Sequence, residues 1–193
     1  MNLQEEQIYH IFNRGNQRQK IFFTEANYFF FLQKIRSQLS PYCEILAYCL
    51  MPNHYHLLVY INKPIANTKE IQNNIVPVLN RKLGTLQSSY TRAIQNQEDF
   101  TGSLFQQKTK AVEIKTDAQM FTCFNYIHQN PMKANLVEKM ENWEFSSFRE
   151  YCNPKIKGFC NHSLLYSLIE IKQADFYSLS YASIPENDLK KIF

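Results

Sequence analysis

The chain has 193 residues, of which 45% are hydrophobic and 15% aromatic, so it has enough apolar side chains to build a core and is not a disordered chain. Its formal net charge of +4 permits binding to nucleic acid but does not require it, because many soluble enzymes are as basic. No segment approaches the roughly 18 to 20 apolar residues that cross a bilayer, and because the first residues are polar and acidic we expect no secretory signal peptide.

The first part of the chain predicts a strand, a turn and a helix. Residues 7–12 are rich in aromatic and β-branched side chains, which is typical of a strand, and residues 13–16 then predict a turn. Thr24 can cap a helix that runs to about Leu39, where Pro41 stops it. The apolar face of this helix is expected to contain Phe29, Leu32, Ile35 and Leu39.

The middle of the chain predicts a pair of strands followed by a long helix. Residues 43–50 and 54–61 have strand composition, and residues 51–53 join them as a tight connection. Helical patterning returns at residues 68–95, where Pro77 interrupts it.

A fourth strand and a last long helix are predicted after that. Residues 104–114 have strand composition. Asp117 can cap a helix that ends near Asn130, because Pro131 follows.

The order of these elements indicates the fold. β-α-β-β-α-β followed by a further helix is the split β-α-β, or ferredoxin-like, pattern. The expected fold class is therefore α+β, with an antiparallel sheet, helices on one face of it and a helical C-terminal extension. Residues 143–151 can form a short packed helix. We expect residues 1–151 to form one domain and residues 152–193 to form an arm whose role the sequence does not indicate.

Two histidines lie on the predicted strand at residues 54–61. Because strand side chains alternate between faces, His54 and His56 share one face and Tyr55 takes the other. Two imidazoles on one rigid strand form half of a divalent metal site. Taken alone, this short pattern is more often an ordinary polar pair than a metal site.

Tyr126 and Asn130 are four residues apart on the last predicted helix, so they share one of its faces. A tyrosine hydroxyl can act as a nucleophile when a neighbouring group activates it, and an amide oxygen one turn away can serve as a ligand. The chain contains 12 tyrosines, however, and most helical tyrosines simply pack. Spacing alone therefore gives Tyr126 no advantage over Tyr90 or Tyr48.

Five stretches of the chain, taken together, resemble a known family. In chain order they are YHIFNRGNQRQKIF (9–22), AYCLMPNHYHLLV (47–59), GSLFQQKTKAV (102–112), YIHQNPMKANLV (126–137) and WEFSSFREY (143–151). The chain resembles the single-tyrosine HUH transposases of the insertion-sequence-200 type, and it is most similar to the REP-associated tyrosine transposases among them. The resemblance covers about residues 8–151, and its NRGN, MPNHxHLL and YIHxNP pieces are very specific in combination.

The resemblance implies a metal-dependent enzyme that cleaves and rejoins single-stranded DNA next to hairpins through a 5′-phosphotyrosine intermediate. His54 and His56 match the HUH pair, Tyr126 matches the nucleophile, and Asn130 matches a polar residue that supplies a further metal ligand. The metal implied is Mg²⁺ or Mn²⁺, although two imidazoles suit Mn²⁺ or Zn²⁺ better than Mg²⁺. The residue between the histidines is hydrophobic in the family and is Tyr55 here. No acidic residue is apparent beside the histidines, which leaves the full ligand set open.

Basic side chains can contact the backbone of such a DNA partner. The candidates are Arg14, Arg18, Lys20, Lys108, Lys110 and Lys133, and aromatic candidates for stacking on bases are Phe12, Phe22 and Phe105. Isolated lysines are more often solvated and phenylalanines more often core. Arg14, in the NRGN piece, is therefore the strongest candidate, while His10 in the same piece is equally explained as a packed strand histidine.

Two other functions stay open on the sequence. One is a hairpin-DNA-binding module that has lost catalysis, although the histidine pair, the tyrosine and the asparagine are all present. The other is a metal-dependent hydrolase that uses water as its nucleophile, which would need a carboxylate base near the histidines. Within the family, a mobile transposase and a host-fixed enzyme are both possible.

The cysteines and the arm bear on location and assembly. Five cysteines, with no CxxC pair, predict reduced thiols and a cytoplasmic protein rather than a disulfide frame. The DNA partner that the resemblance implies predicts association with the nucleoid. The protein is expected to act as a monomer or a homodimer, and the extra arm favours the monomer.

Overall fold

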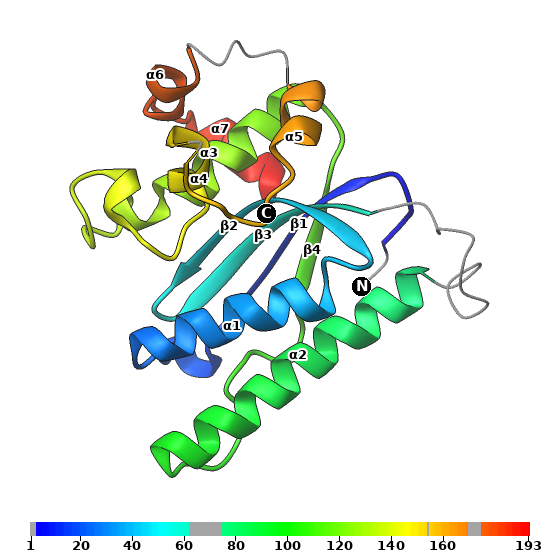
Figure 1. Ribbon diagram of the computed structural model, residues 1–193, viewed down its shortest axis with the longest axis vertical. Coiled ribbons are helices and arrows are strands. Elements are labelled where there is room, and N and C mark those ends of the chain that lie inside the picture. The colour runs from blue at the N-terminus through cyan, green and yellow to red at the C-terminus, as the bar shows by residue number, and fades with distance from the viewer. Residues whose placement is uncertain (1–2, 62–74, 154, 170–174) are drawn as a thin grey trace.

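The computed structural model describes residues 3–61, 75–153, 155–169 and 175–193. Within them, a four-stranded antiparallel sheet has the strand order β2-β3-β1-β4 (Figure 1). The strands are β1 (Ile8–Arg14), β2 (Cys43–Met51), β3 (His54–Ile61) and β4 (Lys110–Ile114). Helices α1 (Glu25–Gln38) and α2 (Ile75–Glu98) complete the order β-α-β-β-α-β. The predicted ferredoxin-like α+β fold is confirmed.

Helices also make up most of the described chain after β4. They are α3 (Asp117–Lys133), α4 (Phe148–Cys152), α5 (His162–Leu168), α6 (Phe176–Ser180) and α7 (Glu186–Leu189), with short 3-10 turns at Met140–Asn142 and Lys190–Ile192. A further 3-10 turn, Asn16–Arg18, lies between β1 and α1. In the described ranges, no helix combines the length and apolar character that a membrane crossing needs.

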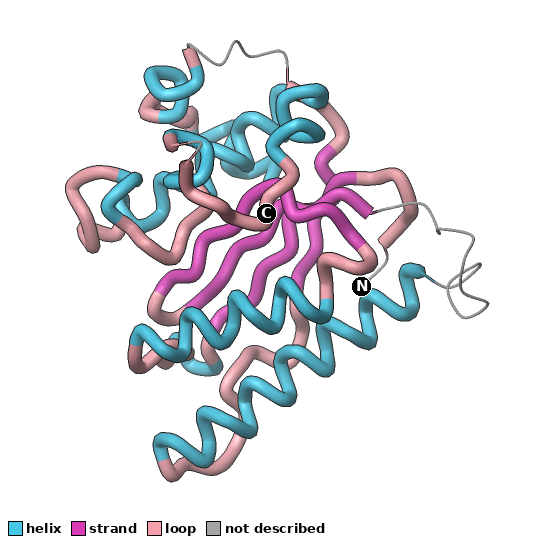
Figure 2. The backbone as a smooth tube through the Cα atoms, viewed as in Figure 1, coloured by secondary structure: helices cyan, strands magenta, loops and turns pink. Residues whose placement is uncertain are grey.

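Helices cover both faces of the sheet, whereas the sequence predicted them on one face. α1 and α2 pack on one side, and α3 with the shorter C-terminal helices packs on the other (Figure 2). The sequence signal for this was in β2, where eight of the nine residues are buried. A strand that is buried on both faces has a continuous apolar run instead of an alternating one. The prediction of helices on one face therefore holds for α1 and α2 and leaves out the second layer that α3 and the C-terminal extension form.

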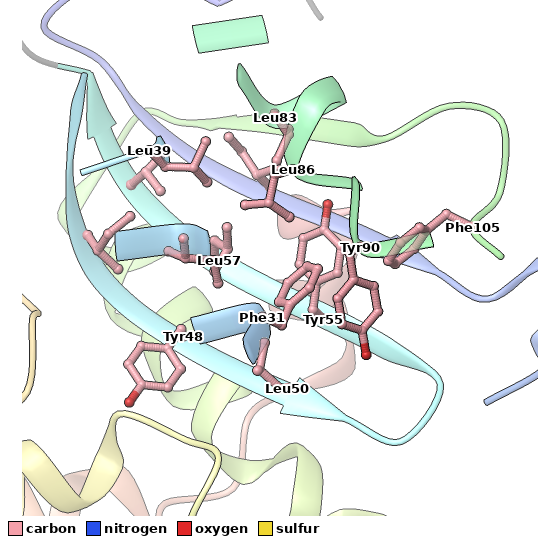
Figure 3. Close-up of a cluster of buried hydrophobic side chains, with 14 of the residues drawn as sticks. Phe31, Leu39, Tyr48, Leu50, Tyr55, Leu57, Leu83, Leu86, Tyr90 and Phe105 are labelled. Atoms are coloured by element: carbon pink, nitrogen blue, oxygen red, sulfur yellow. The ribbon is translucent and has the colours of Figure 1, made fainter. Parts of the chain in front are cut away.

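The core between the sheet and the first two helices is rich in aromatic rings. Phe31 of α1 is fully buried, and its ring centroid lies 4.9 Å from that of Tyr90 on α2 and 5.2 Å from that of Tyr55 on β3 (Figure 3). Phe29, which we expected on the buried face of α1, is 50% exposed. Residues 28–32 are all apolar or aromatic, so two overlapping helical faces satisfy the same spacing, and the structure buries the one that contains Tyr28, Phe31, Ile35 and Leu39.

The side chains of β3 point alternately into the two cores, and a bulge in the neighbouring strand β2 adjusts its pairing with β3. Leu57 belongs to the core under α1 and α2, and Leu58 belongs to the core under α3. The register of β2 shifts between Ile45 and Ala47, which places an extra residue in that strand. After the shift, Cys49 pairs with His56, so the α3 side of β2 faces the same core as the two histidines.

Two strand boundaries differ from the prediction because of pairing between distant segments. β1 continues to Arg14, where we expected a turn, because Arg14 pairs with His54 at the start of β3. β4 begins only at Lys110, where we expected the strand to start at residue 104. The chain before it is held as a loop by Gln106, whose backbone N–H donates to the Arg14 carbonyl at 2.9 Å.

The ends of the long helices also differ. Thr116 caps α3, because its hydroxyl accepts a hydrogen bond from the Gln119 backbone N–H at 3.2 Å. α3 passes through Pro131 and ends at Lys133 instead of stopping near Asn130. Pro77 lies within α2, two residues after its first described residue, Ile75, and the part of this predicted helix before Ile75 lies outside the described residues.

The C-terminal extension is helical, as predicted, and shares the core beneath α3. Its buried apolar residues in that core include Leu165, Ile169, Phe176 and Ile192. Gln129 of α3 fixes part of it, because its Nε2 donates to the carbonyls of Ser180 at 2.7 Å and Ala182 at 2.9 Å. The division at residues 151 and 152 stays a prediction.

His128 allows a test of this second core. Its ring is fully buried against Phe124, Phe148 and Tyr151, with Nε2 2.7 Å from Oγ of Ser147, and burial lowers its pKa to about 3. In the unfolded chain a histidine has a pKa of about 6.5. Below that pH the imidazole is protonated in the unfolded state but stays neutral in the folded state. The free energy of unfolding therefore falls as the pH drops from 6.5 towards 3.

We expect His128→Gln to lower the free energy of unfolding at pH 7. Below pH 6, the difference from the wild type should shrink by about 1.4 kcal/mol per pH unit, because the variant lacks the titrating group. Urea denaturation between pH 7 and pH 4.5 measures this. Ser147→Ala is the control, because it removes the partner, keeps the imidazole and should retain the wild-type slope. A constant difference at every pH would contradict a buried neutral imidazole.

Candidate active site

A cavity of about 350 Å³ lies on the α3 side of the sheet. Its walls come from β1, β3, the chain leading into β4, α3 and the end of the C-terminal extension. The residues that line it are Phe12, Asn13, Arg14, His54, His56, Gln106, Lys108, Lys110, Tyr126 and Phe193. The structure thus brings both predicted histidines and the predicted tyrosine into one cavity.

Strand alternation on β3 determines this arrangement. The ring centroids of His54 and His56 are 4.9 Å apart, and the ring of Tyr126 meets that of His56 edge-on at 5.4 Å. Tyr55, between the histidines, points to the opposite face and is fully buried in the core under α1 and α2. The expected separation of Tyr55 from the two histidines is therefore confirmed.

His56 has one engaged ring nitrogen and one without a partner. Its Nδ1 lies 2.8 Å from Nε2 of His10 on β1, and Nδ1 of His10 lies 2.8 Å from the carbonyl oxygen of Ile192. Nε2 of His56 is buried and has no hydrogen-bond partner among the described residues. Leaving a buried polar atom unpaired costs about 1–3 kcal/mol, so this nitrogen fits a site for a metal ion or another ligand.

His54 is oriented by the residue before it. Its Nδ1 lies 2.6 Å from Oδ1 of Asn53, and Nδ2 of Asn53 donates to the Arg18 carbonyl at 3.3 Å. An amide oxygen can only accept, so His54 carries its proton on Nδ1. Nε2 of His54 is then left with its lone pair.

Both imidazoles are neutral at pH 7. Burial lowers the pKa of His54 to about 4, and the guanidinium of Arg14 contributes in the same direction. Burial also holds the pKa of His56 well below its usual value, with smaller contributions from His10, His54 and Arg14. Because metal binding needs a neutral imidazole, the pair is ready to bind a divalent cation without first losing protons.

Tyr126 is half-buried on α3, and its hydroxyl keeps its proton at neutral pH. Burial raises the pKa of the hydroxyl, and the side chain of Asn130 opposes that shift. Asn130 lies one turn further along, and its Nδ2 donates to the Tyr126 carbonyl at 2.8 Å. It is not among the described residues that line the cavity. Oδ1 is the atom of Asn130 left to act as a ligand, and that role stays a prediction.

The predicted DNA-contacting cations divide into two groups. Arg14, Lys108 and Lys110 line the cavity, and the last two are exposed at its rim. Arg18, Lys20 and Lys133 are exposed, but none of them belongs to the lining. The structure therefore places three of the six candidates beside the histidines, and their contacts to DNA stay predictions.

Residues 13–16, the NRGN piece of the sequence, connect the segments around the rim of the cavity through backbone hydrogen bonds. Gly15 donates its backbone N–H to the Asn53 carbonyl at 2.7 Å, next to the histidines. A Cβ atom at Gly15 would lie 2.1 Å from the Gln19 carbonyl oxygen, so no side chain fits there. Asn16 donates its backbone N–H to the Leu104 carbonyl at 2.9 Å, which ties the loop that carries Lys108 to β1.

Two of the three aromatic candidates for base stacking are core residues. Phe22 and Phe105 are buried under α1 and α2, which agrees with the core role that we favoured over base stacking for isolated phenylalanines. Phe12 lines the cavity, where the ammonium of Lys110 lies 5.6 Å from its ring centroid.

Three lining residues were missed by the sequence reasoning. Asn13 and Gln106 were read as turn and strand residues without a role. Phe193, whose ring meets that of Tyr126 edge-on at 5.0 Å, lies in the segment that carries no recognisable pattern. Phe193 reaches the cavity only because the C-terminal extension packs against distant parts of the chain, and local sequence patterns do not predict such packing.

Two histidines alone do not complete a metal site. Among the described residues, no group of three or more His, Cys, Asp or Glu side chains could hold a metal ion. Further ligands would have to come from an amide such as Asn130, from water or from a bound phosphate. Oxygen ligands of this kind suit Mg²⁺ and Mn²⁺.

Comparisons with known proteins agree on one family. A family model described as transposase, IS200-like, matches residues 4–130. A Haemophilus influenzae protein provisionally named a REP-associated tyrosine transposase is 24% identical over 132 residues, which cover 61% of this chain and 69% of that protein. A solved structure of a REP-associated tyrosine transposase bound to a REP hairpin has a TM-score of 0.58 and 16% identity, covering 81% of this chain and 86% of that one. At that identity it supports the fold alone.

Tyr55 provides a test of the two-faced design of β3. Its hydroxyl accepts a hydrogen bond from Nε2 of Gln87 at 2.6 Å, on the side of the sheet away from the cavity. We expect Tyr55→Phe to lower the free energy of unfolding by about 1 kcal/mol and to leave the affinity for Mn²⁺ unchanged. Urea denaturation and a Mn²⁺ titration measure the two effects. Loss of Mn²⁺ binding in a folded variant would contradict the assignment of Tyr55 to the opposite face.

Proposed function

The chain belongs to the IS200-like transposase family and is a DNA transposase, and from that premise we propose that it cuts and rejoins single-stranded DNA with Tyr126 as the nucleophile, beside a divalent metal ion held by His54 and His56. The observation that supports this most directly is the buried, unpartnered Nε2 of His56 in the same cavity as the tyrosine ring. A neutral imidazole nitrogen without a partner is the atom that a metal ion would use.

The residues present fit a divalent cation. His54 and His56 would hold it through Nε2, and Oδ1 of Asn130 is the proposed further ligand. Mn²⁺ or Mg²⁺ suits a site that mixes nitrogen with oxygen ligands, and Mn²⁺ accepts imidazole more readily. When bound, the ion would polarise the scissile phosphate and stabilise charge on its oxygens.

The chemistry of Tyr126 is a phosphodiester exchange. Its hydroxyl oxygen attacks phosphorus and loses its proton as the new bond forms. The bond from phosphorus to the 3′ oxygen of the upstream strand breaks, and that oxygen takes up a proton to become a free 3′-hydroxyl. The downstream strand stays linked to Tyr126 through its 5′ phosphate. Attack by another 3′-hydroxyl reverses these steps and rejoins the strands without ATP, because one phosphodiester replaces another.

The proposed substrate is single-stranded DNA next to a hairpin. Arg14, Lys108 and Lys110 would contact the phosphates around the cavity. A flexible single strand can bend its phosphate into a cavity of about 350 Å³ between the sheet and α3, which a stacked duplex does less readily. The solved relative with the same fold is described as bound to a REP hairpin, which supports a hairpin as partner.

One copy of the chain contains the whole proposed site. The Tyr126 and His56 rings of the same chain are 5.4 Å apart, so no tyrosine from a second copy is needed. We therefore propose a monomer that acts on chromosomal DNA in the cytoplasm, at the nucleoid.

The two alternatives are less well supported. A hydrolase that activates water would need a carboxylate base, and none of the described residues lining the cavity is Asp or Glu. A binding module without catalysis would have no need for a half-buried tyrosine beside two neutral histidines. Both alternatives predict no covalent protein–DNA product.

Trapping that product tests the proposal. We would incubate the protein and Mn²⁺ with single-stranded oligonucleotides that carry a stem-loop beside a randomised segment and a label at the 3′ end. The wild type should become labelled, because the downstream strand remains on the tyrosine. Tyr126→Phe should bind the same DNA but form at least 100-fold less adduct, since only the attacking oxygen is lost. Denaturing gels measure the labelled protein.

Tyr60→Phe is the matched control, because Tyr60 lies on the same face of β3 but at its far end and outside the cavity lining. It should form adduct at the wild-type level. Adduct formation by Tyr126→Phe would show that another residue is the nucleophile. Adduct formation by the wild type in excess chelator would contradict the metal requirement.

A further inference from the structure

His10 is a buried polar residue next to the cavity that the proposed chemistry does not use. It lies in the middle of β1, is fully buried, and sits diagonally across from His56 in the pairing of β1 with β3. Its ring stacks on that of Phe12 at a centroid distance of 4.7 Å, and both of its nitrogens are engaged, with His56 and with Ile192.

We propose that His10 is a positioning residue for His56, which determines the ring nitrogen that His56 presents to the cavity. This inference rests on the metal site proposed above, because it assigns the group that prepares one of its ligands. His10 does not itself line the cavity, so it would act only through His56.

The backbone carbonyl of Ile192 determines which nitrogen of His10 carries a proton. A carbonyl oxygen can only accept a hydrogen bond, so Nδ1 of His10, 2.8 Å away, must carry a proton and donate it. His10 is fully buried and neither of its hydrogen-bond partners is acidic, so a charged ring would be unpaired there; the ring is therefore neutral and has only that one proton. Nε2 of His10 is therefore a lone-pair acceptor.

The second step transfers this constraint to His56. Its Nδ1 lies 2.8 Å from that acceptor and must donate, so Nδ1 of His56 carries the proton. Nε2 of His56 then has the lone pair, and it is the same buried nitrogen that lacks a partner. The opposite proton arrangement would bring a lone pair of His10 against the carbonyl oxygen of Ile192. The chain from Ile192 through His10 to His56 therefore allows one arrangement of protons.

Without His10, two things would change at His56. The ring could place its proton on Nε2, which cannot bind a metal, and it would lose the contact that fixes its orientation. Groups that hold a metal-binding histidine in this way typically contribute about 10- to 100-fold to metal affinity. His54 would keep its own orientation, because Asn53 sets it independently.

Two substitutions at His10 separate positioning from packing. In His10→Gln, the amide oxygen can reach the place of Nε2 and accept from His56. In His10→Asn, the shorter amide can still donate to the Ile192 carbonyl but ends before His56. Both variants lose the aromatic ring, so a purely structural role should affect them alike.

The first measurement is Mn²⁺ affinity, read from the electron paramagnetic resonance signal of free Mn²⁺. We expect His10→Gln to bind within about threefold of the wild type and His10→Asn to bind about 10- to 100-fold more weakly. Thermal unfolding checks that each variant is folded. Equal affinities for wild type and folded His10→Asn, or equal losses in both variants, would overturn the inference.

The second measurement needs no metal. Nitrogen-15 NMR of the histidine rings reports which nitrogen of His56 is protonated in the metal-free protein. We expect the Nδ1–H form in the wild type and in His10→Gln, and an Nε2–H population in His10→Asn. An Nε2–H form in the wild type would overturn the positioning role. Failure of the wild type to bind Mn²⁺ while its His56 has the Nδ1–H form would instead overturn the metal site alone.

Discussion

The site depends on the alternation of side chains along β3 in a sheet whose two faces are both buried. Tyr55 must enter the aromatic core under α1 and α2, and this requires His54 and His56 to face α3. A slip of one residue would exchange the faces, burying two histidines among apolar rings and bringing a tyrosine to the cavity. The aromatic core thus sets the register that the proposed chemistry needs.

That constraint explains why part of the site could be predicted from sequence. The bounds of β3 and the opposite directions of Tyr55 and the two histidines follow from local alternation, and the structure has them as predicted. The four-residue spacing of Tyr126 and Asn130 could be read in the same way, and their positions one turn apart on α3 agree. Each of these features is local in the chain, which is why sequence patterns report it.

Features that depend on distant contacts could not be predicted. The link from His10 to Ile192 joins residues 182 positions apart, and Phe193 reaches the cavity by the same route. The second layer of helices was missed because apolar runs in β2 were read without regard to burial on both faces. Arg18 is a candidate because of its place near a conspicuous motif, yet it lies on an exposed turn and does not belong to the lining.

The electrostatic character of the cavity follows from these long-range contacts. Two neutral imidazoles share the cavity lining with three cations, and no carboxylate belongs to the described lining. The cavity therefore favours an anionic ligand such as a phosphate. The protein would bind the metal ion through uncharged groups, so the phosphate would supply the negative charge beside it. Burial keeps the histidines neutral, and the backbone and amide acceptors behind them determine which nitrogen each one presents.

The most direct test is a crystal structure of the protein with Mn²⁺, with the metal located by its anomalous scattering. The account predicts one ordered Mn²⁺ in the cavity, bonded to Nε2 of both His54 and His56 and close to the hydroxyl of Tyr126. A cavity that stays empty at saturating Mn²⁺, or a metal bound through Nδ1 of either histidine, would contradict it.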